Sequence, residues 1–138
     1  MNKSDLIKLV EIRVKEAKIL FDHECYHGSY YLLGYALECA LKVCITNQVK
    51  AYDFPNKTLA NQSHQHDLEQ LLIPSGLKFK LAQAEKDDED FKSYWLVVKD
   101  WSEITRYEIS MEEKKAKDFL DAVTNEQTGV LQWIKRYW

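Results

Sequence analysis

The segment from His23 to His27 reads HECYH and matches the pattern H-E-x-x-H. On a helix, this spacing lets two histidines bind zinc while the glutamate acts as general base of a metalloprotease. That chemistry needs a continuous helix and a third ligand. The apolar stripe before the motif runs out near Glu24, and Gly28 follows it directly. We therefore interpret the match as coincidental and expect no metal at this site.

Two charged residues lie within the most apolar segment of the chain, Tyr30 to Ile45, which reads YYLLGYALECALKVCI. Glu38 and Lys42 are spaced i to i+4 in the favourable orientation for an ion pair. Charges in such a helix are costly unless they are paired. Two interpretations stay open: an intrahelical pair at a gap in a helical bundle, or two residues that line a polar pocket.

Two other segments supply polar partners for such a pocket. His66 and Asp67 begin a predicted short helix, and Arg106 and Tyr107 end a longer one. We expect Arg106 to form an ion pair with Glu38 across the bundle, and His66 could approach Arg106 in space. The candidate catalytic residues are thus Arg106 and His66. The candidate polar pocket comprises Glu38, Lys42, His66, Asp67, Arg106 and Tyr107.

The H-x-H spacing of His64 and His66 offers a second metal-binding pattern. No cysteine or carboxylate stands at a supporting spacing, so we expect no metal there either. The lysines Lys114, Lys115 and Lys117 are typical of a solvated helix face, with an RNA-binding patch as the alternative.

The elements that would position these residues are helical. With only 4 Gly and 2 Pro, the chain has few enforced turns. Apolar residues at three- and four-residue spacing predict a first helix capped by Ser4 that ends near Glu24, and a central helix from Ser29 to Asn47. Residues 48–63, with Pro55 and Asn56, are expected to form a loop.

The second half of the chain shows the same spacing. A short helix is predicted from Asp67 to Leu72, and Pro74–Gly76 ends it. A further helix carries Phe91, Tyr94, Trp95, Val98, Trp101 and Thr105 on one face. A capping box at Ser110–Glu113 opens one long last helix through Tyr137. The pattern predicts an all-α protein, an antiparallel up-and-down bundle of four to five helices in one domain, 1–138.

Composition restricts the class of protein further. A net charge of −3 gives no overall basic field for nucleic acid. The odd number of cysteines, 3, has no CxxC spacing and favours a reducing cytoplasm. The first residues alternate charged with apolar side chains, which predicts neither a signal peptide nor a membrane span. Trp133, Tyr137 and Trp138 near the C-terminus are typical of packing or of a homodimer contact.

Taken in order, several segments resemble the HEPN (higher eukaryotes and prokaryotes nucleotide-binding) domain family. They are YYLLGYALECALK, HDLEQLL, W-x4-RYE from Trp101 to Glu108, and a final helix that contains LQWIK; the resemblance spans roughly Leu6 to Ile134. It implies a bundle of four or five helices, often dimeric. It also implies a role in toxin–antitoxin or defence systems, with a nucleotidyltransferase as a common partner.

Active members of that family are metal-independent endoribonucleases with an arginine followed, after four to six residues, by a histidine. In this chain Arg106 is followed by YEISMEE, and no histidine occurs after His66. The resemblance therefore favours a non-catalytic interaction or nucleotide- or RNA-associated module without a cofactor. The alternative is a divergent metal-independent ribonuclease that uses Arg106 with His66.

Overall fold

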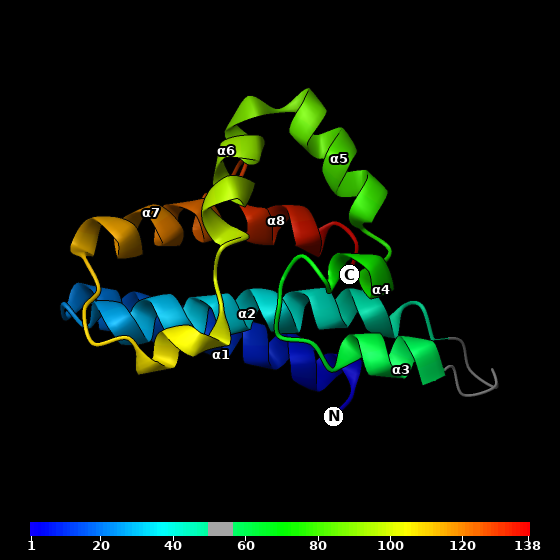
Figure 1. The fold of residues 1–138 in the computed structure, drawn as a ribbon, viewed down its shortest axis with the longest axis horizontal. Helices are drawn as coiled ribbons and strands as arrows, with labels where there is room; N and C mark the ends of the chain where they lie inside the picture. The colour runs from blue at the N-terminus through cyan, green and yellow to red at the C-terminus, as the bar shows by residue number, and fades with distance from the viewer. Residues whose placement is uncertain (50–56) are drawn as a thin grey trace.

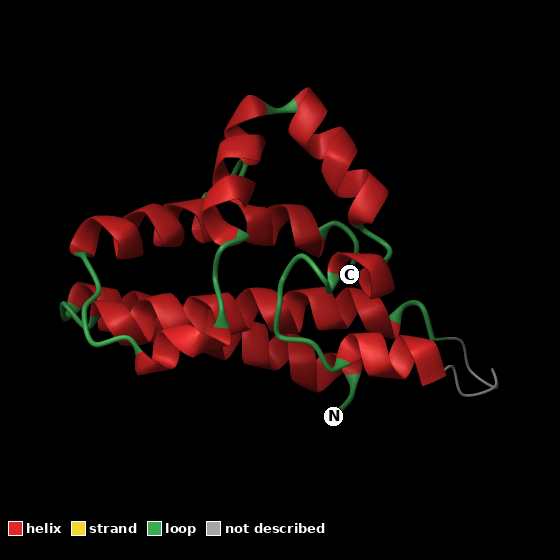
Figure 2. Ribbon diagram, viewed as in Figure 1, coloured by secondary structure: helices red, strands yellow, loops and turns green. Residues whose placement is uncertain are grey.

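The protein is all-helical in the part that the computed structural model describes, residues 1–49 and 57–138, and these ranges contain no strand (Figures 1 and 2). This confirms the predicted all-α class. The elements are α1 (Lys3–Asp22), α2 (Tyr26–Thr46), α3 (Lys57–Ser63), α4 (Leu72–Ser75), α5 (Lys78–Asp87), α6 (Glu89–Val98), the 3₁₀ helix η1 (Glu103–Tyr107), α7 (Glu113–Thr124) and α8 (Val130–Lys135).

Helix α2 is the centre of the molecule, as its nearly all-apolar sequence predicts. It packs antiparallel along α1, and it also contacts α4, η1, α7 and α8 (Figure 1). The hydroxyl of Ser29 donates to the carbonyl of Ala17 at 2.8 Å and so joins α1 and α2. Because α2 lies between α1 and the C-terminal helices α7 and α8, its residues Leu33, Leu37 and Leu41 are completely or almost completely buried.

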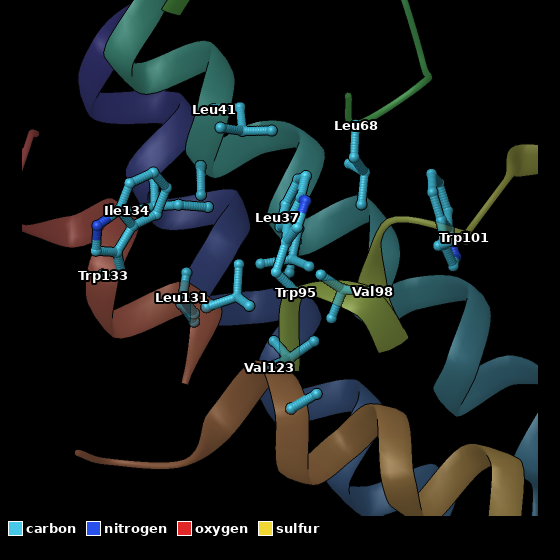
Figure 3. Packing of buried hydrophobic residues seen from close by; sticks show 14 of the residues in the cluster. Leu37, Leu41, Leu68, Trp95, Val98, Trp101, Val123, Leu131, Trp133 and Ile134 are labelled. Atoms are coloured by element: carbon cyan, nitrogen blue, oxygen red, sulfur yellow. The ribbon is translucent and has the colours of Figure 1, made fainter. Parts of the chain in front are cut away.

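The C-terminal half of the chain covers the other side of α2. Helices α7 and α8 follow one another along that side, and the α5–α6 hairpin projects away from them (Figure 1). Trp95 and Val98 of α6 lie among Leu37, Val123 and Leu131 in the core (Figure 3). The chain from Trp101 through η1 then returns across α2, which is how Arg106 and Glu103 reach the central helix.

The first two helices begin at other residues than predicted, whereas their ends lie within two residues of the predicted ones. Asn2, not Ser4, caps α1, and it forms a reciprocal capping box with Asp5. The break between α1 and α2 falls at Glu24, whose φ of 61° is left-handed. Gly28 lies inside α2, where a Cβ would stand 3.0 Å from Cδ1 of Leu20. This glycine therefore allows close α1–α2 packing and does not end a helix.

The region between α2 and α6 holds helices that the sequence pattern did not predict. Residues 57–63, expected as loop, form α3, whereas Pro55 and Asn56 lie outside the described residues. Asp67 accepts from the backbone N–H groups of Glu69 and Gln70, at 2.9 and 3.2 Å, but it caps a turn. The helix there, α4, begins only at Leu72. Helix α5 was not predicted because Leu81 is its only buried residue, so its sequence has no apolar residues repeated at helical spacing.

The last two predicted helices are also interrupted. Helix α6 ends at Val98, and the buried side chains of Trp101 and Thr105 belong to the turn and to η1. The predicted Ser110 capping box is absent, since α7 starts after Glu112 without a side-chain cap. The long last helix is split at Asn125, whose Oδ1 accepts from the backbone N–H of Gln127 and Thr128.

Among the described residues, none of the helices is both long enough and apolar enough to cross a membrane.

Candidate functional site

The centre of the candidate site is the carboxylate of Glu38, which is buried in α2 with 3% of the residue exposed. The ammonium of Lys42 donates to Oε1 at 2.7 Å, so the predicted Glu38–Lys42 pair forms. His66 Nδ1 lies 3.1 Å from each carboxylate oxygen. An ionised carboxylate only accepts, so this contact places a proton on Nδ1. The buried charge is thus held by two partners, one local and one distant in sequence.

The other nitrogen of His66 faces a second carboxylate. Nε2 lies 3.3 Å from Oε2 of Glu103 in η1. The imidazole ring also lies beside the phenol of Tyr35, with 6.3 Å between ring centroids. A carboxylate at Nδ1 is the usual device for orienting a catalytic imidazole, but a general base also needs the opposite nitrogen open to substrate. Here Glu103 stands at that position.

Two tyrosines on the same face of α2 extend the polar surface toward Arg106. A hydrogen bond with Tyr31 is the largest cause that raises the pKa of Tyr35, followed by burial and by the charges of Glu38 and Glu103. A hydrogen bond with Tyr31 likewise raises the pKa of Arg106. The guanidinium of Arg106 is exposed and lies over the ring of Tyr107, 4.8 Å from its centroid.

The predicted Arg106–Glu38 ion pair is wrong. Within ion-pair distance Glu38 contacts Lys42 and His66, and Arg106 instead contacts Tyr31 and Tyr107. The reason is topological, because α6 ends at Val98 and η1 then turns Arg106 to the outer surface of α2. Its neighbour Tyr107 is also exposed, at 71%.

Of the six predicted pocket residues, the structure brings Glu38, Lys42 and His66 into contact, while Asp67 bonds to the backbone of its own turn. Sequence reasoning missed Tyr31, Tyr35, Trp101 and Glu103. A signal for the tyrosines was present: Tyr31, Tyr35, Glu38 and Lys42 follow at spacings of four, three and four residues, which is one face of a helix. Glu103 carried no such signal, since it lies in a separate segment.

Trp101 packs directly on the backbone of α2. A Cβ on Gly34 would stand 1.9 Å from Cε2 of Trp101, so only glycine allows the indole to lie there. The indole meets the ring of Tyr35 edge-on, with 5.6 Å between centroids. Its Nε1 is buried and has no hydrogen-bond partner in the described part of the chain. Beside it, residues 64–67 and 101–103 enclose a pocket of about 190 Å³.

A larger groove opens on the other side of Glu38, between α1, α2 and α3. Its volume is about 550 Å³, and we refer to it as the α1–α3 groove. Apolar side chains form most of it: Met1, Leu6, Leu9, Tyr35, Cys39, Ile45 and Val49. The polar residues that line it are Arg13, Glu38, Lys42, Thr46, Ser63 and His64. Glu38 therefore borders this groove and also holds His66.

The HECYH segment does not form the helical zinc arrangement. Helix α1 ends before His23, which is its C-cap, and His27 lies in the first turn of α2, so no continuous helix carries both residues. His23 Nδ1 lies 2.9 Å from the carbonyl oxygen of Ile19, and His27 Nε2 lies 2.7 Å from that of Ile109. Among the described residues, no group of three or more histidines, cysteines and carboxylates is arranged to hold a metal ion.

The two other surfaces considered from the sequence are occupied by internal contacts. Lys114 and Lys117 pair with Asp118 and Asp121, at 3.0 and 2.6 Å, and Lys115 lies over the ring of Tyr30. Near the C-terminus, Trp133 is buried against Phe91, and Tyr137 packs on Trp133. Trp138 is partly buried beneath Lys135. These aromatic residues belong to the core and its edge.

Comparisons of the chain with family models, with curated proteins and with solved structures found no match.

Proposed function

We propose that the chain is a non-catalytic HEPN-like domain that acts as an interaction or nucleotide- or RNA-associated module. Its partner would be a nucleotidyltransferase or another component of a toxin–antitoxin or defence system, and the domain would work as a cytoplasmic homodimer. The order of the segments in the sequence and the all-helical fold around a central apolar helix support this proposal.

The observation that carries the non-catalytic part is the environment of His66. Both of its ring nitrogens face carboxylates, at 3.1 Å from Glu38 and 3.3 Å from Glu103. A phosphodiester at this position would meet two negative groups, which repel it. The contacts of His66 are those of a residue that joins the 64–67 segment to α2 and η1.

A second candidate function is the divergent metal-independent ribonuclease with Arg106 and His66. One observation favours it: the ring of Tyr31 packs edge-on against that of Tyr35, which lies beside the imidazole of His66. Tyr31 also raises the pKa of Arg106 through a hydrogen bond. In that reaction Arg106 would hold the phosphate, and His66 would exchange protons with the 2′-hydroxyl.

Incubation of the purified protein with total RNA in EDTA separates the two functions. The variants Arg106→Ala and His66→Ala are compared with His64→Ala, which removes the neighbouring exposed histidine of the same segment. We expect no cleavage by any of the four proteins, together with lower thermal stability of His66→Ala alone. Cleavage that persists in EDTA, disappears in Arg106→Ala and His66→Ala, and remains in His64→Ala would establish the ribonuclease instead.

The homodimer is tested by sedimentation equilibrium of the wild-type protein. We expect a dimer mass through the micromolar range, and a constant monomer mass would contradict this part of the proposal.

A further inference from the structure

The α1–α3 groove has the dimensions and walls of a small-molecule site. Its volume of about 550 Å³ falls in the range of roughly 300–1,000 Å³ that ligand pockets occupy. Leu6 and Leu9 of α1 face Cys39 and Ile45 of α2 across it, so most of its surface is apolar. A few charged groups at one place on an apolar wall are typical of sites that orient a ligand.

The hydroxyl groups of the groove are already satisfied by their own helices. Thr46 donates to the carbonyl of Val43 at 2.6 Å, and Ser63 donates to that of Ala60 at 2.7 Å. A ligand with many hydroxyl or ring-nitrogen groups, such as a nucleoside, would find few partners there. The apolar wall therefore favours a ligand with a hydrocarbon body.

Two cationic side chains, Arg13 and Lys42, line the described part of the groove, against one acidic side chain. Among the described residues that line it, Glu38 is the one acidic side chain, and its carboxylate is engaged by Lys42 and by His66 from outside the groove. Arg13 bonds through Nη1 to Glu16, which does not line the groove. A guanidinium has five N–H donors, so this single bond leaves donors for another acceptor.

The thiol of Cys39 lies among these charges. Burial is the largest cause that raises its pKa and Glu38 adds to the rise, while the charges of Lys42 and Arg13 act in the opposite direction. Both cations therefore influence the same side chain, Cys39, which lines the groove together with Leu9 and Ile45.

We propose that the α1–α3 groove binds an amphipathic monoanion, an aliphatic carboxylate whose acidic head contacts Arg13 and Lys42 and whose hydrocarbon body lies against Leu6, Leu9 and Ile45. The carboxylate suits the guanidinium because its two oxygens match the planar fork of donors. The groove shares Glu38 and Tyr35 with the surroundings of His66, but neither Arg106 nor His66 lines it. The binding test therefore uses other residues than the ribonuclease test, and the two can fail independently.

The probe is decanoate below its micelle concentration, measured by isothermal titration calorimetry on the full chain. Decanol, with a neutral head, and decyltrimethylammonium, with a cationic head, share the hydrocarbon body and serve as charge controls. We expect decanoate to bind more tightly than decanol, and the cation to bind weakest. Equal affinities of decanoate and decanol would overturn the proposal.

Two variants locate the head group. Arg13→Gln should weaken decanoate binding about fivefold to tenfold, the value of one partly exposed charge-assisted contact, and leave decanol binding unchanged. Lys8→Gln, which removes an exposed cation of the same helix outside the groove, should leave both affinities unchanged. If the two variants behave alike, the acidic head does not contact Arg13.

Thiol labelling tests occupation of the groove without any substitution. Cys39 lines the groove, Cys25 is exposed outside it and Cys44 is buried. Decanoate should slow the reaction of methyl methanethiosulfonate with Cys39 and leave the reaction of Cys25 unchanged, as read by peptide mass spectrometry. Unchanged labelling of Cys39 at saturating decanoate would refute the site. Stronger protection by AMP than by decanoate would assign the groove to nucleotides instead.

Discussion

The two members of the Glu38–Lys42 pair should differ in how much stability they contribute when each is removed alone. The side chain of Glu38 is 4% exposed, whereas that of Lys42 is 25% exposed. Removal of the cation leaves a carboxylate in the interior, but removal of the acid leaves an ammonium that can turn to water. We therefore predict that Lys42→Met destabilises the protein more than Glu38→Gln.

The expected magnitudes follow from these exposures. Loss of one partner of a buried ion pair costs about 3–5 kcal/mol. His66 still contacts the carboxylate at 3.1 Å, so we expect about 2–3 kcal/mol for Lys42→Met. Glu38→Gln keeps the shape and an acceptor oxygen, and hydration of the freed Lys42 offsets part of the lost charge-assisted bond. We expect about 1 kcal/mol for this variant.

The assay is urea-induced unfolding near pH 7, followed by circular dichroism, with the free energy of unfolding extrapolated to water. The double variant Glu38→Gln/Lys42→Met removes both charges and should be more stable than Lys42→Met alone. Lys114→Met is the matched control. It removes the cation of an exposed i,i+4 pair with Asp118, so we expect a change within about 0.5 kcal/mol.

The reasoning fails if Glu38→Gln costs as much as Lys42→Met, or if the two single effects add in the double variant. Either result would mean that the carboxylate of Glu38 does not depend on Lys42 for compensation.

Two further substitutions test the packing of α2. Gly34→Ala should destabilise the protein by about 1–3 kcal/mol despite the better helix propensity of alanine, because its Cβ would overlap the indole of Trp101. Gly28→Ala should cost less, because its Cβ would meet only the flexible end of a leucine side chain. Thermal unfolding of both variants measures the difference. Equal stability of the two variants would contradict the close contact. Burial, followed by the charges of Glu108 and Asp100, raises the pKa of Tyr30 to about 12. Since the pKa of the phenol in the unfolded chain is near 10, the free energy of unfolding should fall as pH rises from about 10 to 12. Urea unfolding of Tyr30→Phe should show a smaller fall over this pH range. Identical pH profiles of the wild type and the variant would refute this.

Local patterns predicted the parts of the fold that depend on neighbours along the chain. The apolar period predicted α1, α2 and α6, and the i,i+4 spacing predicted the Glu38–Lys42 pair. Boundaries were less accurate, because a glycine ends a helix in one context and allows close packing in another. Gly28 does the second, while Gly76, with a φ of 78°, does the first.

The candidate site was predicted only in part, because its residues come from separate segments of the chain. The sequence identified Glu38 as a charge that needs a partner. The predicted partner was Arg106, whereas the structure shows His66 in contact with it. Both residues are polar and both lie at the ends of predicted elements, so the sequence does not rank them. The end of α6 at Val98 and the return of η1 over α2 place Glu103, not Arg106, beside His66.

The amino-acid order by itself determined the helical class, the central position of α2 and the requirement that Glu38 be paired, because each follows from side chains within one or two helical turns. Tertiary structure decided that His66 completes the pair, that HECYH spans the turn between α1 and α2 and that an apolar groove opens beside Arg13. These features join residues that are far apart in the chain. The distances between such residues depend on how the helices pack, and a repeat of apolar residues within one helix does not specify that packing.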